Sequence, residues 1–404
     1  MNSITPSPVP DEPLRPLNRE GAIPPPARAP LPVANVDGFA PSDSLAADPG
    51  KLRAGTSLQL IIDGKNAFPE LFQSLRGARK EIVMEYFLVK DGQITRELAD
   101  ILATKVKEGV KVRFLYDWFG SRKFDDSIIR QIAASGVEVV RHGGILGKGL
   151  PQSDHRKLTV IDGQTAFTGG INLGDHYIEQ YHDVMIKIGG PVVADLHASF
   201  AENWQQATGE QLAPIPAPAP EGTYTTEVLA TDPERHPFKK ALFQAVDTAT
   251  SSIAVEMAYI TDDTLIDKLI AASGRGVDVR LIVPEKGDES LIQGLHRLSY
   301  DRLVRGGVKV FLFPDRMAHT KVAVVDSRWA VVGSTNGTHR ALNTNDELSL
   351  AVHDPRFAQE LQTRLLAVDE RQAIPVTEAY LTSHPIPRGE RLKARLTEMF
   401  DFLL

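Results

Sequence analysis

An 18-residue pattern that occurs twice constrains the fold of this chain more than any other feature. The first copy, at residues 155–172, reads HRKLTVIDGQTAFTGGIN, and the second, at residues 319–336, reads HTKVAVVDSRWAVVGSTN. Both copies follow H-x-K-x4-D-x6-G-[GS]-x-N without insertion or deletion, and each histidine is followed after 28 positions by an acidic residue, Asp183 or Glu347. Chemically reactive positions repeated at fixed spacing indicate a duplication rather than a coincidence.

The repeat extends well beyond the two motifs. SSIAVEMAYI (251–260) matches EIVMEYFLV (81–89), so that Glu256 takes the position of Glu85. GVDVRLIVP matches GVKVRFLYD, and GVKVFLFP matches GVEVVRHGG, in the same order along the chain. Alternating strand and helix patterns with nearly continuous apolar strands predict an α/β fold. We expect two homologous α/β sandwich halves related by a pseudo-two-fold axis, with the active site at their interface.

The composition of successive segments predicts the domain organisation. The first 50 residues hold 12 of the 27 prolines, so residues 1–54 are expected to be a disordered Pro-rich segment, with the first strand beginning near Leu58. We assign the halves to residues 55–212 and 222–370, joined by a Pro-rich linker at 213–221.

The C-terminal extension, residues 371–404, is expected to contain an amphipathic helix. Its apolar residues recur at helical spacing, which suits either packing on the core or contact with a membrane surface: Leu392, Leu396, Phe400, Leu403 and Leu404. Within the first half, the patterns predict helices at 69–79 and 95–107 and strands at 81–89 and 111–119.

The amino-acid composition and net charge argue against several classes of protein. A chain without cysteine has no disulfide, no thiolate nucleophile and no Cys-based metal site. Its net charge of −7 argues against binding nucleic acid by bulk electrostatics. No apolar run is long enough to span a membrane, and the N-terminus lacks the apolar core of a secretory signal. We therefore expect a cytoplasmic protein with no cofactor and no metal; its oligomeric state is left open.

Each motif is expected to form a strand that presents a histidine and a lysine on one face. Side chains two residues apart on a strand point the same way, so His155 projects with Lys157 and His319 with Lys321. Across a two-fold axis, two imidazoles and two ammonium groups would converge on one pocket. Such a pocket suits a phosphate, because one histidine can attack phosphorus while the other protonates the leaving alcohol.

Two further pairs of repeated residues are expected to support this phosphate site. Asn172 and Asn336, which follow a Gly-Gly or Gly-Ser turn, can add amide donors. A histidine that acts as nucleophile or acid needs its tautomer fixed by a partner on the second ring nitrogen. Asp183 and Glu347 are expected to orient the histidines that precede them by 28 residues.

Four other acidic positions allow two interpretations. Glu85 and Glu256 are predicted to face the site, where they would either contact the substrate or make structural hydrogen bonds. Asp162 and Asp326 complete the two motifs and are counted with the catalytic set. For these two aspartates we favour a structural role, in which the side chain caps the turn that follows the strand.

The duplicated motif resembles the signature of the phospholipase D superfamily, H-x-K-x4-D in two copies. The similarity covers about residues 55–370, and several of its segments resemble bacterial cardiolipin synthases: 62–92, 154–175, 181–193, 275–290 and 318–352. The resemblance implies that His155 is the nucleophile and His319 the acid and base. It also implies transfer of a phosphatidyl group to a hydroxyl of phosphatidylglycerol.

The expected function is therefore a phosphatidyltransferase that forms cardiolipin from phosphatidylglycerol through a phosphohistidine, without a metal. The alternatives are a phospholipase D-type hydrolase, a nucleic-acid phosphodiesterase and a non-catalytic lipid-binding protein. A peripheral contact with the inner face of the cell membrane is expected, through Trp118-Phe119, Ile145-Leu146 or the C-terminal helix. The sequence departs from the family after Asn336, where GTHRALNTNDE replaces a pattern with an Asp and an Arg-Ser pair.

Overall fold

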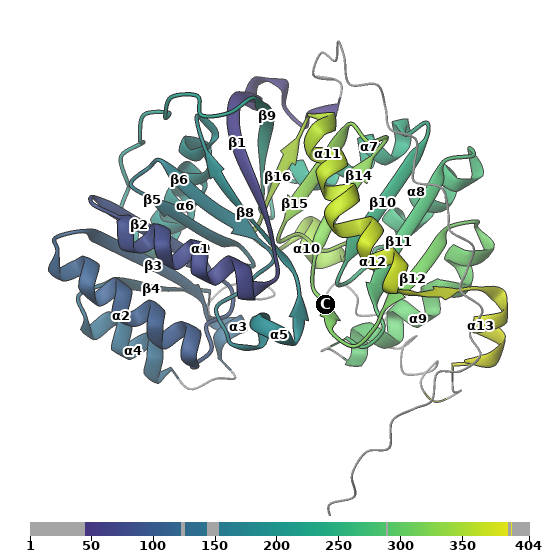
Figure 1. The fold of residues 1–404 in the computed structure, drawn as a ribbon, viewed down its shortest axis with the longest axis horizontal. Helices are drawn as coiled ribbons and strands as arrows, with labels where there is room; N and C mark the ends of the chain where they lie inside the picture. The colour runs from purple at the N-terminus through teal and green to yellow at the C-terminus, as the bar shows by residue number, and fades with distance from the viewer. Residues whose placement is uncertain (1–44, 123–125, 144–152, 288–289, 387–388, 390–404) are drawn as a thin grey trace, which may run out of the picture. The chain divides into compact units, whose positions relative to one another are not determined.

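The strands of the described chain form one large mixed sheet whose order repeats about its centre. The computed structural model describes residues 45–122, 126–143, 153–287, 290–386 and 389. In this part of the chain, fifteen strands lie in the order β17-β12-β11-β10-β14-β15-β16-β9-β1-β8-β6-β5-β2-β3-β4. Outward from the central pair β1 and β9, the equivalent strands of the two halves follow in the same order (Figure 1). The predicted fold, two similar α/β halves, is confirmed.

The first half contributes seven strands of this sheet and the helices that cover it. The strands are β1 (Arg53–Ile62), β2 (Glu81–Tyr86), β3 (Lys111–Asp117), β4 (Glu138–His142), β5 (Lys157–Ile161), β6 (Thr165–Gly169) and β8 (Val184–Gly189). The helices are α1 (Gly64–Gly77), α2 (Gln93–Lys107), α3 (Trp118–Ser121), α4 (Ser127–Ala134), α5 (His176–Glu179) and α6 (Val192–Thr208). Strands β2, β3 and β4 pair in parallel, whereas β5, β6 and β8 pair with their neighbours in antiparallel fashion.

The second half repeats this plan and adds a strand at its outer edge. Its strands are β9 (Tyr224–Thr231), β10 (Ser252–Met257), β11 (Asp278–Pro284), β12 (Lys309–Phe313), β14 (Lys321–Val325), β15 (Trp329–Gly333), β16 (Glu347–Val352) and β17 (Ile374–Val376). Its helices are α7 (Pro237–Thr248), α8 (Asp263–Gly274), α9 (Ser290–Arg305), α10 (His339–Asn343), α11 (Pro355–Leu361), α12 (Ala367–Gln372) and α13 (Glu378–Ser383). A π-helical turn, η3 (Gln362–Leu366), joins α11 to α12.

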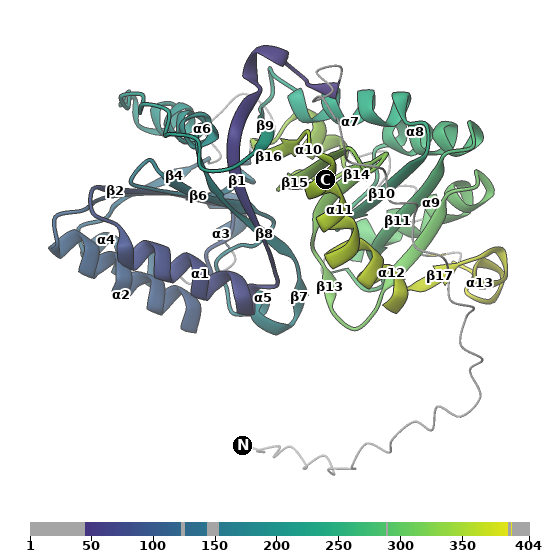
Figure 2. The ribbon, with the colours of Figure 1, turned by 45° about the horizontal axis from the view of Figure 1, so that its top comes forward.

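Buried apolar side chains form three groups, of which only the third joins the two halves. One lies between the first-half sheet and helices α1, α2 and α4, and a second lies between the second-half sheet and helices α7 and α8 (Figure 2). The third contains side chains from both halves, including residues of α6, α11 and η3. Because this third core draws on β5 and β14 alike, the two motif strands are buried in the same hydrophobic environment.

Two short strands form a second link between the halves. β7 (Tyr181–His182) of the first half pairs in parallel with β13 (Met317–Ala318) of the second half. At the corresponding place on the other side of the repeat, Asp154 forms an isolated parallel bridge with Asp346. Each contact joins the residues just before one motif histidine to the residues just before the other half's acidic residue. These two links position the site described below.

Several predicted boundaries differ from those in the structure. β1 begins at Arg53, five residues before the predicted start at Leu58, and a 3-10 helix, η2 (Pro49–Lys51), precedes it. α1 begins at Gly64, so that Pro69 lies inside the helix and does not start it. The strand predicted for 111–119 ends at Asp117, because the Asp117 carboxylate accepts a hydrogen bond from the Gly120 amide and caps α3.

The proposed linker, residues 213–221, contains no helix or strand, and the predicted domain limits remain predictions. Several predicted features lie outside the described residues: most of the Pro-rich N-terminal segment, the apolar residues of the C-terminal helix, and the Ile145-Leu146 pair. Within the described ranges, no helix combines the length and the apolar character that a membrane span requires.

Candidate active site

The two motif strands place their lysines in one buried environment. Every residue of β5 and of β14 is buried, including Lys157 and Lys321. The Lys157 ammonium donates to the His155 carbonyl at 2.5 Å, and the Lys321 ammonium likewise donates to the carbonyl of His319. Each lysine thus folds back towards the histidine of its own motif. The imidazoles keep a small exposed area, 12% of the His155 side chain and 8% of the His319 side chain.

Each histidine is paired with the carboxylate of the other half. His155 Nδ1 lies 3.0 Å from Glu347 Oε2, and His319 Nδ1 lies 2.7 Å from Asp183 Oδ2. The expectation that each acidic residue orients the histidine 28 positions before it is therefore wrong in its pairing. A carboxylate beside Nδ1 favours the tautomer that carries its proton there, which leaves Nε2 with a free lone pair. Both histidines are thus oriented, and each half completes the other.

The backbone explains why the pairs cross. The His155 amide donates to the Asp346 carbonyl at 2.8 Å, and the His319 amide donates to the His182 carbonyl at 2.7 Å. His182 and Asp346 each precede the acidic residue of their half, so the following side chain is brought beside the opposite histidine. Because these contacts are main-chain hydrogen bonds between halves, the motif pattern alone does not reveal them.

The residue after the motif glycine adapts each half to its own acid. In the first half a Cβ at Gly170 would overlap the Asp183 carboxylate, so glycine leaves room for this side chain. In the second half Ser334 occupies this position, and its hydroxyl donates to Glu347 Oε2 at 2.5 Å. The G-[GS] variation in the motif therefore goes with the exchange of aspartate for glutamate 13 residues later.

The pKa values of the central groups reflect burial and the concentration of positive charge. Burial lowers the pKa of His155, as do Lys157 and Lys321, whereas Glu347 opposes the shift. Burial and the two lysines hold the pKa of His319 well below its usual range. Burial also lowers the pKa of Lys157 to about 7. An anion that enters among these groups would favour their protonated forms, which is the behaviour expected of a phosphate site.

Burial likewise raises the pKa of Asp183 to about 7, although Lys321, the Val184 amide and Lys157 oppose the change.

Aromatic rings, which the sequence patterns do not identify, enclose both histidines. The Phe87 ring lies edge-on to the His155 ring with 4.7 Å between centroids, and the Lys157 ammonium lies 5.1 Å from the Phe87 centroid. Tyr177 and Tyr181 approach the His319 ring, with centroid distances of 5.6 and 5.5 Å. Such apolar walls reduce solvent screening of the charges between them.

The two asparagines differ in their surroundings. Asn172 Oδ1 accepts from the Leu88 amide at 3.1 Å, and its Nδ2 donates to the Tyr177 hydroxyl at 2.8 Å. This asparagine therefore secures the loop after β2 and the ring that borders His319. Asn336 Oδ1 is buried and has no hydrogen-bond partner among the described residues. Their predicted role as phosphate donors stays a prediction.

Asp162 and Asp326 lie at the far ends of the motif strands, away from the histidines. Asp162 accepts from the amides of Arg79, Lys80 and Glu81, at distances between 2.7 and 3.2 Å. Six residues, five of them in β5, separate it from His155, which places the two roughly 20 Å apart at about 3.3 Å per residue. The prediction that places these aspartates in the catalytic set is wrong, because neither carboxylate reaches the histidines.

Asp326 makes the equivalent contacts in the second half. It accepts from the Thr250, Ser251 and Ser252 amides at 2.8 to 2.9 Å. Burial raises the pKa of Asp326, but these amides more than offset it and hold the pKa below its usual value. The capping role is the one that these contacts describe.

Glu85 of β2 and Glu256 of β10 point to the face of the sheet opposite to the one that carries the motif lysines. Glu85 pairs across the sheet with Leu158, and Glu256 pairs with Val322, each one residue along from its lysine. Glu85 accepts from Asn203 Nδ2 at 2.7 Å, and Glu256 accepts from the Thr320 hydroxyl at 2.7 Å. Of the two interpretations, the structure supports the structural hydrogen bond.

A buried ionic cluster adjoins the His319 side of the site. His182 Nδ1 lies 2.7 Å from Asp63 Oδ1 and Nε2 lies 3.0 Å from Asp369 Oδ2, while its ring stacks on Phe313 at 4.9 Å. Burial lowers the pKa of His182, but the two carboxylates prevail and raise it to about 10. Among the described residues, His182, Glu256 and Asp369 are the one group of donors close enough to hold a metal ion.

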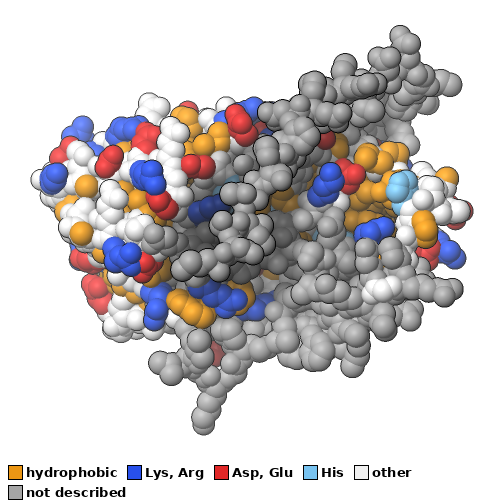
Figure 3. Space-filling view, turned by 90° about the horizontal axis from the view of Figure 1, so that it is seen from below, with side chains coloured by type: hydrophobic (Ala, Val, Ile, Leu, Met, Phe, Trp, Pro, Cys, Tyr) orange, Lys and Arg blue, Asp and Glu red, His pale blue; other side chains and the backbone are white. Residues whose placement is uncertain are grey.

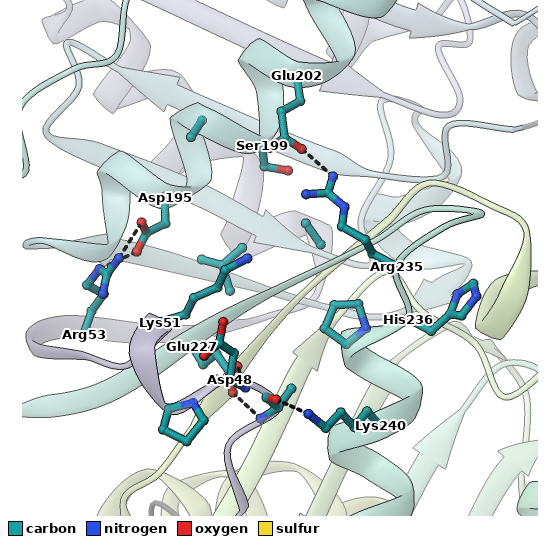
Figure 4. A pocket seen from close by; sticks show the side chains of 16 residues that line it. Asp48, Lys51, Arg53, Asp195, Ser199, Glu202, Glu227, Arg235, His236 and Lys240 are labelled. Carbon is teal, nitrogen blue, oxygen red and sulfur yellow. Dashed lines mark hydrogen bonds and ion pairs between the residues drawn. The ribbon is translucent and has the colours of Figure 1, made fainter.

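A cavity of about 840 Å³ lies elsewhere, among η2, α6, β9 and α7. Figure 4 shows Arg53 directed at Asp195 and Arg235 directed at Glu202, with ion-pair distances of 2.7 and 2.6 Å. Neither motif histidine lines this cavity, and its cations are largely matched by its own acidic residues. It is separate from the site built by the two motifs.

Comparison with known proteins is consistent with this geometry. The model of a family described as cardiolipin synthase, PLD-like domain, matches residues 71–204 and 242–368. Cardiolipin synthase A of Pseudomonas putida (strain W619) is 32% identical over 366 residues, which cover 87% of this chain and 76% of that protein. A probable cardiolipin synthase of Bacillus subtilis (strain 168) is 30% identical over 326 residues, covering 76% of this chain and 65% of that protein.

Two solved structures share the fold. The phosphatidylserine synthase of Haemophilus influenzae Rd KW20 superposes with a TM-score of 0.65 at 14% identity, covering 86% of this chain and 95% of that chain. A polyphosphate kinase from Porphyromonas gingivalis superposes with a TM-score of 0.57 at 15% identity, covering 85% of this chain and 53% of that chain. At these identities the similarity concerns the fold alone.

Proposed function

Since this chain belongs to the cardiolipin synthase family of phospholipase D-like enzymes, we propose that it is a phosphatidyltransferase that forms cardiolipin from two molecules of phosphatidylglycerol. One observation carries the proposal: two largely buried histidines, each with a carboxylate of the other half on Nδ1 and a lysine from its own motif, lie at the junction of the two halves. A two-step transfer needs two such groups, one to attack and one to move the proton.

In the first step His155 Nε2 attacks the phosphorus of the donor lipid. A P–N bond forms, and the P–O bond to the headgroup glycerol breaks. His319, protonated on Nε2, gives its proton to the departing oxygen, so glycerol leaves as a neutral alcohol. Glu347 stabilises the positive charge that develops on His155, to which its Oε2 is 3.0 Å away. Asp183 does the same for protonated His319.

In the second step the acceptor phosphatidylglycerol takes the place of glycerol. Its free hydroxyl loses its proton to His319 Nε2 as the oxygen attacks phosphorus, and the P–N bond to His155 breaks. Cardiolipin leaves, and both histidines return to their initial states. The net reaction converts two phosphatidylglycerol molecules into one cardiolipin and one glycerol.

The lysines provide the charge that the phosphoryl oxygens need. Lys157 and Lys321 are buried at the site, where a positive charge interacts with an anion more strongly than it would in water. No step in this scheme requires a metal ion. The substrates reside in a bilayer, so we propose a peripheral contact with the inner face of the cell membrane. Trp118 and Phe119, both partly exposed on α3, are the described candidates for that contact.

Product analysis on vesicles of phosphatidylglycerol tests the proposal. The purified protein should produce cardiolipin and glycerol in equal amounts in the presence of a chelator, and His155→Ala should abolish both products. Arg76→Gln, an exposed change on α1, should leave the rate unaltered. Phosphatidic acid as the sole lipid product would identify a hydrolase, and absence of any lipid product would refute the catalytic assignment.

A further inference from the structure

The proposed transfer requires a second phospholipid, and the inference that follows rests on that proposed function. A phosphatidylglycerol donor carries one phosphodiester, which the two histidines and two lysines accommodate. In the acceptor, the attacking hydroxyl belongs to a glycerol whose other end carries a phosphodiester of its own. A second anion must therefore lie within one glycerol of the reacting phosphorus, whereas water as acceptor brings no such anion.

Two arginines, one from each half, share a single aromatic ring beside the site. The Arg122 guanidinium lies 3.8 Å from the Phe119 ring centroid and 5.4 Å from that of Trp118. The Arg340 guanidinium lies 5.5 Å from the same Phe119 ring. Arg122 follows α3 directly and Arg340 belongs to α10, so the pair spans the junction of the halves as the histidines do.

Both arginines are connected to the His155 side of the site. The Asp117 carboxylate caps α3 through the Gly120 amide at 2.8 Å and accepts from the Asp154 amide, next to His155, at 2.9 Å. Arg340 Nε donates to Asn345 Oδ1 at 2.9 Å, two residues before the glutamate that holds His155. The α3 segment and the histidine are thus fixed by one carboxylate.

The electrostatics favour an anion between the two guanidinium groups. Burial lowers the pKa of Arg340; Asp117 and Glu347 oppose this change, while Arg122 adds to it by repulsion. Within the described residues, exposed Arg122 makes no ion pair with a carboxylate. Two like charges on one ring repel each other unless an anion lies between them. Guanidinium groups also suit phosphate particularly well, because they donate two parallel hydrogen bonds.

We propose that Arg122 and Arg340, both held against Phe119, form a second phosphodiester subsite that binds the headgroup phosphate of the acceptor phospholipid. This subsite favours transfer over hydrolysis. It raises the local concentration of the lipid acceptor, whereas water carries no phosphate and does not bind to it. Figure 3, which views the molecule from below, shows Lys and Arg side chains beside the grey central region of that face. An anionic lipid surface would be attracted there.

A competition between two acceptors tests the subsite. Phosphatidylglycerol vesicles are supplied with 1-butanol, an acceptor without phosphate, and cardiolipin and phosphatidylbutanol are quantified by mass spectrometry. Arg122→Gln and Arg340→Gln should each lower the ratio of cardiolipin to phosphatidylbutanol by about tenfold or more, the loss expected for a charge-assisted phosphate contact. Arg76→Gln, which removes an exposed arginine paired with Glu97, serves as the matched control with an unchanged ratio.

An unchanged ratio in Arg122→Gln, or a parallel fall of both products, would overturn the subsite. Arg122 is exposed, so this variant gives a result even if Arg340→Gln fails to fold. The proposed function fails by a different outcome, namely wild-type protein that makes no cardiolipin from these vesicles.

Discussion

At the scale of single residues, the decisive feature is that each motif histidine contacts a carboxylate from the other half. His155 is held by Glu347 at 3.0 Å and His319 by Asp183 at 2.7 Å. The repeated spacing of 28 residues identifies all four side chains, because chemically active residues recur together. The spacing cannot identify the partners, since a distance along the chain does not say which half a side chain faces.

Because each carboxylate contacts the histidine of the other half, replacing it should impair that histidine. Asp183→Asn should impair His319, and its rate with phosphatidylglycerol should fall by about 10²- to 10⁴-fold, the usual contribution of a general acid. A phosphatidyl ester of p-nitrophenol needs no acid for its leaving group. In the first turnover Asp183→Asn should therefore release p-nitrophenol at close to the wild-type rate, whereas Glu347→Gln, which impairs the nucleophile, should be slow with both substrates.

First-turnover release of p-nitrophenol, followed by stopped-flow absorbance, separates the two variants. The reverse pattern, with Glu347→Gln fast and Asp183→Asn slow, would mean that each acid serves the histidine of its own half. If the crossed contacts were retained instead, the reverse pattern would make His319 and not His155 the nucleophile.

At the scale of elements, the sequence patterns predict strand and helix interiors well and their ends less well. The predicted strands at 81–89 and 111–119 are present as β2 and β3, but both are shorter than predicted. Their apolar patterns continue into Phe87-Leu88 and Trp118-Phe119, which lie beyond the strands; the Phe87 ring contacts His155. Local hydrophobicity cannot separate a strand that continues from a loop whose apolar residues line a pocket.

The motif aspartates illustrate the same limit. Asp162 and Asp326 belong to the sequence signature, yet both have positive φ angles, 54° and 51°, and accept backbone amides at the far end of the strands. They fix the segment that leads into β2 or β10. Membership of a repeated motif therefore does not establish a part in the chemistry.

Replacing these aspartates should affect stability and not catalysis. Asp162→Ala leaves three backbone amides without their acceptor and should lower the free energy of unfolding by about 1–2 kcal/mol. Asp326→Ala should behave similarly. Urea denaturation measures the loss, and the rate per folded molecule should stay within about twofold of wild type. A loss of activity by orders of magnitude in a folded variant would return Asp162 to the catalytic set.

At the scale of the whole molecule, the two halves are joined by a common core and by buried charge. His182 lies between Asp63 of its own half and Asp369 of the other, and Arg316 of the second half also contacts Asp63 at 2.9 Å. No spacing rule predicts this cluster, because its members come from four distant segments. The predicted two-fold arrangement is approximate, since Asp346 holds the position equivalent to His182.

Removing the charge of His182 should loosen the junction of the halves. His182→Gln removes the cation beside buried Asp369 and leaves Asp63 with Arg316 alone, and it should lower the free energy of unfolding by about 3–5 kcal/mol. The folded pKa of about 10 exceeds the ordinary 6.5, so this stabilisation is complete below pH 6.5 and is lost as the pH rises towards 10.

Urea denaturation of wild type and His182→Gln across this pH range measures the difference. It should shrink steadily between pH 6.5 and 10, and His384→Gln, an exposed control on the C-terminal side of α13, should have little effect at any pH. A difference that does not vary with pH would show that His182 stabilises the fold by packing and not by charge.

The most direct test of the account is to identify the residue that carries the phosphatidyl group during turnover. The enzyme is mixed with phosphatidylglycerol vesicles, denatured rapidly under alkaline conditions that preserve phosphohistidine, digested and examined by mass spectrometry. The account predicts a phosphatidyl adduct on the peptide that contains His155 and none in His155→Ala; with the p-nitrophenol ester, whose leaving group needs no acid, the same adduct should accumulate in His319→Ala. An adduct on His319, or cardiolipin formed at the wild-type rate by His155→Ala, would contradict it.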